Sequence, residues 1–364
     1  MAQDNIDSND DIVIIKIGGS SITNKANEET LNETAIDWFA KLIASCVHTS
    51  FLHHTITTKL DKEDDDQSST LEGRKKFKFI VVHGAGSFGH HSAKRYGLQC
   101  GKAALLNDAS NNNNNSSSSG GSDSSGTQQE RKRYQMEGLS KTRHSVQKLN
   151  AAMVGKLLDH GVNAVGISPG VNFPGMRSYG SSITSNKNVD EESSSSVAAM
   201  ELLSESICQS LDAGLLPVIH GDACLLDETH AGILGGDTLV EGLVGSKKMK
   251  ESIHKVIFIT DVAGVFTSDP KTNDDARLIQ SLRVDMTTGE VTSDEDTLAE
   301  MDIGGSSHAH DVTGGLKAKL GAAVTAVQCG KDVIIAKCCS ESAEKFVQGD
   351  DSCTEAGTVI SRKL

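Results

Sequence analysis

The 364-residue sequence predicts an α/β protein, a three-layer α/β/α sandwich with a mainly parallel central sheet. Two observations predict this class. Six apolar segments lack polar alternation, which is typical of strands covered on both faces, as in a parallel sheet. Helical stretches and glycine-rich turns separate these segments. The predicted strands are residues 12–17, 77–83, 163–168, 216–220, 255–260 and 332–336.

The first strand contains a lysine and runs into paired glycines. Lys16 is followed by Gly18, Gly19 and Ser20. A lysine in a buried strand is unfavourable unless its ammonium group meets an anion, and glycines let backbone N–H groups approach phosphate oxygens closely. The segment therefore favours an anion site. The alternative is an ordinary turn beside a lysine whose ammonium group reaches solvent.

The second strand runs into another glycine-rich loop. Residues 83–90 read HGAGSFGH and contain the pattern GxGxxG. A dinucleotide-binding turn requires an acidic residue about 20 positions further on, where this chain has an Asn/Ser tract. A second anion-binding loop fits better, with His90 as a donor to a phosphate. Ala85 is compatible with such a loop if its φ is negative.

Three polar segments interrupt the pattern, at about 53–75, 105–130 and 183–197. Their acidic, Asn and Ser residues offer too little apolar surface to offset the entropy of ordering, so we predict disordered loops. Between the second and third segments, apolar residues recur at helical spacing over 134–160. Gly161 is a suitable C-terminal stop for this predicted helix.

Three further motifs lie in the C-terminal half. Residues 235–237 (GGD) precede an apolar helix, residues 260–266 (TDVAGVF) follow a strand, and residues 311–319 (DVTGGLKAK) open a helix with lysines in its first turn. Lysines there oppose the helix dipole, so unless they are merely solvated they favour a bound anion. For Asp237, helix capping is the alternative. Together the motifs indicate two phosphate-bearing ligands, as phosphoryl transfer requires, without a Walker A or protein-kinase motif.

Charge and composition exclude several classes of function. The chain has 35 basic and 49 acidic residues, and the net charge of −14 disfavours partners such as nucleic acid or an anionic membrane. No apolar run approaches the roughly 20 residues of a transmembrane helix, and the N-terminus is unlike a signal peptide. Eight scattered cysteines without a CxxC pair indicate a reducing compartment. We therefore expect a cytoplasmic protein without a zinc site.

Five stretches of the chain resemble the amino acid kinase superfamily, and within it the isopentenyl phosphate kinases. They are KIGGSSITNK (16–25), VHGAGSFGHH (82–91), GLSKTRHSVQKLN with GVNAVGISPG (138–150 and 161–170), PVIHGD with ILGGDTL (217–222 and 233–239), and TDVAGVF with DVTGGLKAKL (260–266 and 311–320). The SFGH that ends in His90 is the most specific of these. The resemblance implies the amino acid kinase fold, with an acceptor-binding lobe over 1–225, an ATP-binding lobe over 226–364, and one sheet continuous through both.

The resemblance also implies a role for each matching residue. The catalytic set is Lys16, His90, Asp237 and Lys319. The ATP-binding set is Lys16, Gly18, Gly19, Ser20, Lys25, Asp261, Gly264, Val265, Phe266, Gly314, Gly315 and Lys319. The acceptor-binding set is Gly84, Ala85, Gly86, Ser87, Gly89, His90, Gly221 and Asp222. Asp237 would orient the lysines rather than act as a base, because a phosphate acceptor is already ionised near neutral pH.

The implied reaction is the ATP- and Mg²⁺-dependent phosphorylation of isopentenyl phosphate to isopentenyl diphosphate, a step of isoprenoid biosynthesis, by a homodimer. Mg²⁺ would bridge nucleotide oxygens, with no metal ligand implied in the chain. The prenyl group needs an apolar wall, for which the helix over 134–157 is the candidate, although most of its apolar residues are expected to pack on the sheet. Two alternatives stay open: a kinase of the same fold for another small phosphate or phosphonate such as fosfomycin, and a nucleotide-binding regulator without turnover.

Overall fold

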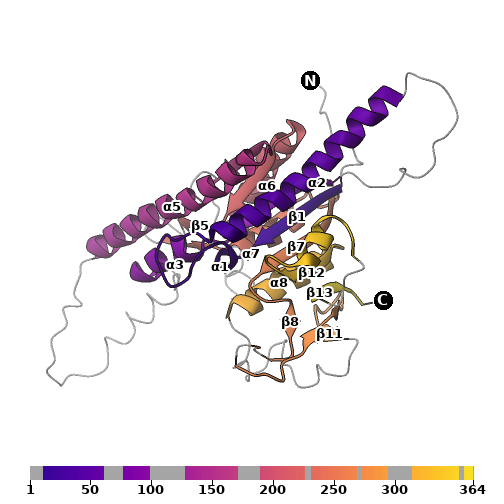
Figure 1. The fold of residues 1–364 in the computed structure, drawn as a ribbon. Coiled ribbons are helices and arrows are strands. Elements are labelled where there is room, and N and C mark those ends of the chain that lie inside the picture. Colours follow the sequence, from indigo (N-terminus) through magenta and orange to yellow (C-terminus); the bar gives the residue numbers. More distant parts are fainter. Residues whose placement is uncertain are drawn as a thin grey trace.

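The computed structural model describes residues 11–60, 77–98, 128–170, 189–225, 231–268, 270, 272–293, 314–351 and 356–363 (Figure 1). Its strands are β1 (Asp11–Ile17), β2 (Phe77–His83), β3 (Ala164–Ile167), β4 (Leu216–His220), β5 (Asp222–Leu225), β6 (Ala231–Leu234), β7 (Ile253–Thr260), β8 (Val265–Phe266), β9 (Leu278–Ile279), β10 (Ser281–Val284), β11 (Val291–Ser293), β12 (Asp332–Lys337) and β13 (Gly357–Arg362). Its helices are α1 (Gly19–Ile22), α2 (Glu33–Leu60), α3 (Gly86–Arg95), α5 (Gln128–Asp159), α6 (Val189–Asp212), α7 (Gly236–Gly245), α8 (Gly314–Gln328) and α9 (Glu341–Val347).

Nine of these strands form one sheet, in the order β11-β10-β13-β12-β7-β1-β2-β4-β3. From β12 to β3 every neighbouring pair is parallel, whereas β13 is antiparallel to β12 and β11 is antiparallel to β10. The mainly parallel sheet predicted from the sequence is therefore confirmed. All six predicted strands lie in the parallel part, and β2 and β4 have the predicted bounds.

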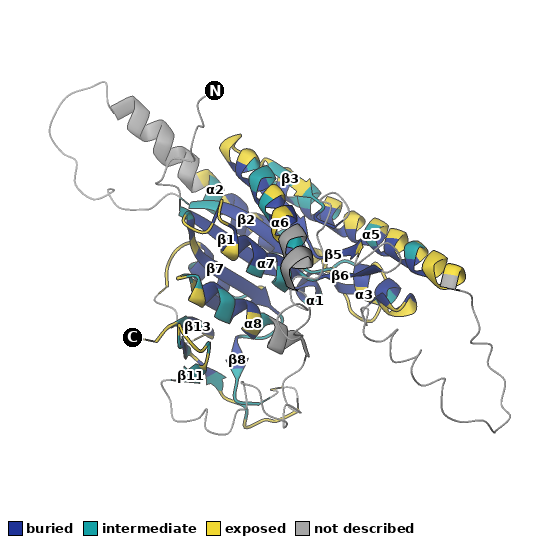
Figure 2. Cartoon of the chain, turned by 180° about the vertical axis from the view of Figure 1, so that it is seen from behind, coloured by how far each residue is buried: buried dark blue, intermediate teal, exposed yellow. Residues whose placement is uncertain are grey.

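Helices cover both faces of the sheet, and the alternation along β1 shows how. Ile12 and Ile14 pack in a core with α6, α7 and α8. Val13, Ile15 and Ile17 point to the other face and pack with α2, α5 and α9. Figure 2 shows β1, β2 and β7 buried between these layers, while the outer surface of α5 is exposed. This arrangement is the predicted three-layer α/β/α sandwich.

The helices correct two predictions about the polar segments. Residues 53–60 belong to helix α2, and residues 189–197 belong to helix α6, so parts of the segments predicted as disordered loops are helical. A helix extends where flanking turns propagate it, which local composition does not reveal. The remainder of the three segments, apart from 128–130 at the start of α5, lies outside the described residues. The predicted helix over 134–160 is α5, and Gly161 follows it with a φ of +78°.

Within the described ranges, no helix is long and apolar enough to cross a membrane.

Candidate active site

The predicted site residues gather where the central parallel strands end. In the register of the sheet, Ile17 at the end of β1 lies opposite His83 of β2 and Ile259 of β7. The loops that follow these strands therefore leave the sheet at one edge. Open α/β sheets bind ligands at this edge.

Lys16 is buried and paired. Its Nζ lies 2.8 Å from Oδ1 of Asp237, and the two side chains are 6% and 20% exposed. Lys16 shares the face of β1 with Ile14, and this face meets the start of α7, where Gly236 lies against the lysine stem. Gly235 is the N-cap of α7, and the Asp237 carboxylate binds the lysine. The pair removes the penalty of a buried, isolated ammonium group.

Two glycine loops touch each other through their backbones. A Cβ on Gly19 would overlap the backbone N of Gly86 and would lie 2.9 Å from the carbonyl carbon of Gly84. A Cβ on Gly84 would lie 2.6 Å from the backbone N of Gly19. Gly86 also has a φ of +50°, which disfavours other residues. Ala85 has the negative φ, −74°, that its methyl group requires. Glycine is therefore needed here for contact between the loops.

The side chains of Thr23, which the sequence did not single out, and of Ser87 hold these loops together. The hydroxyl of Thr23 donates to Gly19 O at 2.7 Å and accepts from the N–H of Ser87 at 2.9 Å. The hydroxyl of Ser87 lies between the backbone N and O of Thr30, 3.3 Å from each. Ser87 was predicted to bind the acceptor, but these polar groups already join the two loops.

Three lysines and two aspartates lie within electrostatic range of one another at this edge. Lys25 Nζ lies 3.4 Å from Oδ2 of Asp261, in an exposed pair. Burial is the main cause that lowers the pKa of Lys319, and the positive charge of Lys16 adds to it. The carboxylates of Asp237 and Asp261 act in the opposite direction on this pKa. Lys319 therefore lies within electrostatic range of the whole group.

His90 lies on α3, directly after the second glycine loop. Its side chain is exposed, and its pKa is lowered by partial burial and by the charges of Lys25 and His91. Gly89 packs α3 against α5, because a Cβ there would meet Ala85 and Val146. His90 therefore lies within electrostatic range of Lys25, at the end of the second glycine loop.

Comparisons with known proteins agree with this geometry. The model of the amino acid kinase family matches residues 11–337. The chain belongs to the amino acid kinase family. It is 28% identical over 367 residues to an isopentenyl phosphate kinase of Arabidopsis thaliana, an alignment that covers 95% of this chain and 94% of the relative. An isopentenyl phosphate kinase of Thermoplasma acidophilum is 24% identical, over 78% of this chain and 80% of the relative. A crystal structure of an isopentenyl phosphate kinase superposes with a TM-score of 0.58 at 22% identity, covering 96% of this chain and 100% of that chain, which confirms the fold.

Two residues predicted to bind the acceptor also make contacts within the framework of this amino acid kinase. Asp222 is fully buried, and its Oδ2 lies 2.6 Å from Nη1 of Arg143 and accepts from the N–H of Gly170 at 3.1 Å. Burial raises the pKa of Asp222 against these interactions. The N–H of Gly221 donates to His83 O at 2.9 Å. In this structure both residues hold the site's framework. Arg143 was missed because no local pattern marks its partner 79 positions away.

The remaining predicted ATP-binding residues lie in β8, in the residue before it and at the start of α8. Gly264 packs against Thr358, and the N–H of Val265 donates to the Thr358 hydroxyl at 2.8 Å. Val265 is fully buried in the core, and with Phe266 it forms β8. Gly314 and Gly315 begin α8, whereas residues 311–313 of the same motif lie outside the described chain.

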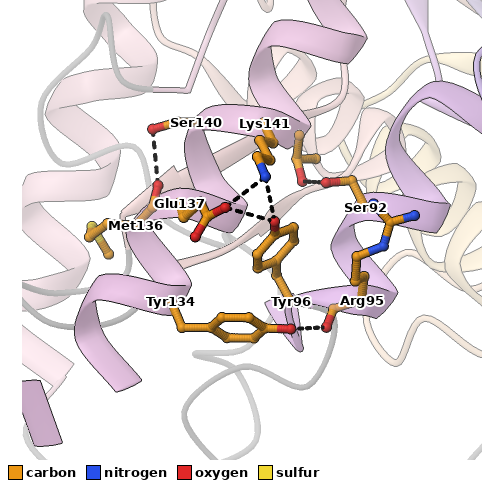
Figure 3. A network of polar contacts seen from close by, with 9 residues as sticks. Ser92, Arg95, Tyr96, Tyr134, Met136, Glu137, Ser140 and Lys141 are labelled. Carbon is orange, nitrogen blue, oxygen red and sulfur yellow. Dashed lines mark hydrogen bonds and ion pairs between the residues drawn. The ribbon is translucent and has the colours of Figure 1, made fainter. Parts of the chain in front are cut away.

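A polar seam joins α3 to α5 beyond His90 (Figure 3). Lys141 Nζ donates to Glu137 Oε1 at 2.6 Å and to the hydroxyl of Tyr96 at 2.9 Å. Tyr96 in turn donates to Glu137 at 3.1 Å, and the ring of Tyr134 packs at 4.7 Å from that of Tyr96. Tyr134 also donates to Arg95 O at 2.9 Å. The seam fixes the position of the Tyr96 ring.

Under this seam lies a small apolar cluster that is separate from the two cores of the sheet. Helices α3 and α5 and the β5-β6 hairpin contribute to it. Its members are Ala93, Tyr96, Leu98, Leu139, Ala223 and Ala231, with Met136 and Ile233 packed against them. Leu149 and Met153 of α5 pack instead in the core on the sheet, as expected for most apolar residues of this helix.

Proposed function

We propose that this amino acid kinase transfers the γ-phosphoryl group of ATP to isopentenyl phosphate and forms isopentenyl diphosphate. One observation carries the proposal: the loops at Gly19 and at Gly84–Gly86 touch through their backbones beside the buried Lys16. If the first loop holds the nucleotide phosphates and the second holds the acceptor phosphate, the two phosphates lie side by side. Such positioning supplies much of the catalysis of phosphoryl transfer.

The chain's own residues would act chiefly through charge. Lys16 and Lys319 would stabilise the negative charge that spreads over the transferring group, and His90 would donate to the acceptor phosphate. Asp237, 2.8 Å from Lys16, would orient the ammonium group. No general base is required, because the acceptor phosphate is ionised at neutral pH.

Mg²⁺ would arrive with ATP and neutralise charge on its phosphates. Among the described residues, no group of three or more His, Cys, Asp or Glu side chains lies close enough to hold a metal ion by itself. Mg²⁺ in kinases is held largely by substrate phosphates and one or two carboxylates. Asp237 and Asp261 lie in the lysine cluster and are suited to that supporting role.

The isoprenoid chain of the acceptor would lie against the apolar cluster of α3, α5 and the β5-β6 hairpin. Gly89 and Ala93 lie one turn apart on α3, so the helix leads from the acceptor loop to this cluster. Met136 and Leu139 are the residues of the predicted wall that belong to it. An apolar contact of this kind favours a prenyl phosphate over fosfomycin, which has no comparable chain.

We further propose a cytoplasmic homodimer, with the acceptor bound by the lobe of residues 1–225 and ATP by the lobe of 226–364. The six described cysteines are free thiols, which supports a reducing compartment. One sheet runs through both lobes, so the two ligands would bind to a single rigid body.

A coupled assay of ADP release tests the function directly. We expect turnover with isopentenyl phosphate far above that with fosfomycin, UMP, glutamate and N-acetylglutamate, and dimethylallyl phosphate is assayed beside it to measure the preference between the two prenyl phosphates. Turnover of another acceptor alone would move the function to that substrate, and folded, ATP-binding protein that is silent with every acceptor would favour the regulator.

Two variants test the site. Lys16→Ala and His90→Ala should remove most of the activity and leave the fold intact. His144→Ala replaces an exposed histidine of α5 and is the matched control, with activity close to the wild type. Near-normal turnover by folded His90→Ala protein would contradict the role of His90.

A further inference from the structure

Two histidines lie beneath the acceptor loop, and neither is among the site residues predicted from the sequence. His83 ends β2 and His220 ends β4, and they lie opposite each other in the register of these strands. Both side chains are buried, and their rings stack with centroids 5.7 Å apart. Each histidine precedes a glycine, Gly84 or Gly221, so the same dipeptide ends two neighbouring strands.

The contacts of His83 determine its tautomer. Its Nδ1 lies 3.1 Å from the carbonyl oxygen of Gly84, which can only accept, so Nδ1 carries the hydrogen. Its Nε2 lies 3.0 Å from the amide Nδ2 of Asn150, which also donates to Val218 O at 3.2 Å. The neutral Nδ1–H ring therefore satisfies both contacts. Protonation would place a second donor on Nε2 against the Asn150 amide.

His220 repeats the pattern on the next strand. Its Nδ1 lies 3.0 Å from Gly221 O, and its Nε2 lies 2.8 Å from the hydroxyl of Ser168. The pKa of His83 is lowered to about 3, first by burial and then by the charge of His220. Burial also lowers the pKa of His220, against the attraction of Asp222. Both rings are thus neutral near pH 7.

The bond from His83 fixes one peptide of the acceptor loop. The Gly84–Ala85 peptide is planar and trans, so its carbonyl and its N–H point in opposite directions. When Nδ1–H of His83 holds Gly84 O, the N–H of Ala85 is turned away from the histidine. The N–H of Gly84 is held as well, at 3.0 Å from Ile17 O. The bond from His83 therefore sets the direction of the Ala85 N–H, and the bond to Ile17 sets that of the Gly84 N–H.

We propose that His83 is a positioning residue for the acceptor phosphate: its Nδ1–H orients the Gly84–Ala85 peptide, and Asn150 of α5 selects the tautomer that makes this bond. The inference rests on the proposed function, in which residues 84–86 bind a phosphate monoester. It adds a residue that never touches the acceptor and still determines how tightly the acceptor binds.

Two substitutions of His83 separate positioning from packing. The side-chain amide of His83→Asn can donate from the place of Nδ1, whereas that of His83→Gln reaches the place of Nε2. We expect His83→Asn to keep the wild-type KM for isopentenyl phosphate and His83→Gln to raise it about tenfold or more, with the KM for ATP unchanged in both. Ser168→Ala is the matched control, because it removes the equivalent donor to His220 and should leave both KM values unchanged.

Equal effects of the two His83 variants on the acceptor KM would overturn the proposal, because a packing role does not distinguish them. Should both variants fail to fold, the ring ¹⁵N shifts of the wild-type protein decide: an Nδ1–H tautomer at His83 supports the proposal and an Nε2–H tautomer refutes it. This measurement needs no turnover. If the wild type phosphorylates another phosphate acceptor, the proposed substrate fails and the same variants test positioning with that acceptor.

Discussion

Substitution by alanine should destabilise the protein at Gly19 and have little effect on stability at the adjacent Gly18. A Cβ on Gly19 would overlap the backbone of Gly86 and crowd the backbone of Gly84, and backbone atoms cannot rotate away. A Cβ on Gly18 would meet its nearest atoms at 3.5 to 3.7 Å, which is ordinary contact. Gly18 also has a φ of −64° and a ψ of 134°, values that alanine adopts without strain.

The magnitudes follow from these distances. For Gly19→Ala the two loops must separate by several tenths of an ångström or more, and overpacking of this kind costs about 1–3 kcal/mol of stability. Because the displaced atoms hold the two phosphates in the proposed reaction, we expect kcat/KM to fall by about a hundredfold. Gly18→Ala should change the unfolding free energy by no more than about 0.5 kcal/mol.

Urea denaturation and the coupled ADP assay measure both quantities for the two variants. A raised KM for ATP in Gly18→Ala at unchanged stability would still agree with the reasoning, since Gly18 is among the residues predicted to bind ATP. Wild-type stability and activity in Gly19→Ala, or equal losses of stability in both variants, would refute it.

Three further predictions concern the charge pair, the buried histidine and the long helix. Asp237→Asn leaves Lys16 without its carboxylate, so steady-state kinetics should show kcat lower by about ten- to a hundredfold with a near-normal acceptor KM, and an unchanged kcat would contradict the orienting role. Because the pKa of His83 lies at about 3 in the folded protein and at 6.5 ordinarily, the unfolded state binds more protons between these values. The unfolding free energy should therefore rise with pH from 3 to 6.5, with up to about 1.4 kcal/mol per pH unit from this group, and denaturation of His83→Asn should show a flatter profile. On α5, a Cβ at Gly155 would have no atom within 4 Å, so Gly155→Ala should stabilise the protein by about 0.5–1 kcal/mol. A Cβ at Gly138 would overlap the side chain of Tyr96, so Gly138→Ala should lower the melting temperature.

The parallel sheet could be predicted because its signal is local. Each buried strand, such as β1 or β7, consists mainly of apolar residues without polar alternation, and burial on both faces favours that composition. The hairpins β5-β6 and β8-β9 were not predicted. Their strands are two to four residues long, and pairing rather than composition defines them. The first residues of α6 were predicted as a loop because they are mostly Ser and acidic residues, which do not indicate a helix. The apolar turns that follow in α6 stabilise the helix.

The candidate site divides in the same way. The lysines and glycine loops could be predicted from the sequence, because a lysine inside an apolar strand and paired glycines at a strand end are unusual. It does not mark the Arg143–Asp222 ion pair or the Asn150–His83 contact, whose partners are 79 and 67 positions apart. Only the fold brings them together. The one sequence signal available was the repeated His-Gly at the ends of β2 and β4, which becomes informative once the strands are known to be neighbours.

Several contacts between residues far apart in the sequence fix the positions of charged side chains. The chain carries a net charge of −14, yet its fold brings Lys16, Lys25 and Lys319 within electrostatic range of two aspartates. Burial and the positive charges of Lys16 and Lys25 lower the pKa of Lys319. A bound anion would favour the charged form of this lysine. His83 is neutral, and Asp222 is paired with Arg143, so neither adds an unpaired charge near the lysines. A phosphate-bearing ligand would therefore meet lysines and loop N–H groups that are already held in position. Preorganised donors of this kind stabilise the charge that develops in phosphoryl transfer.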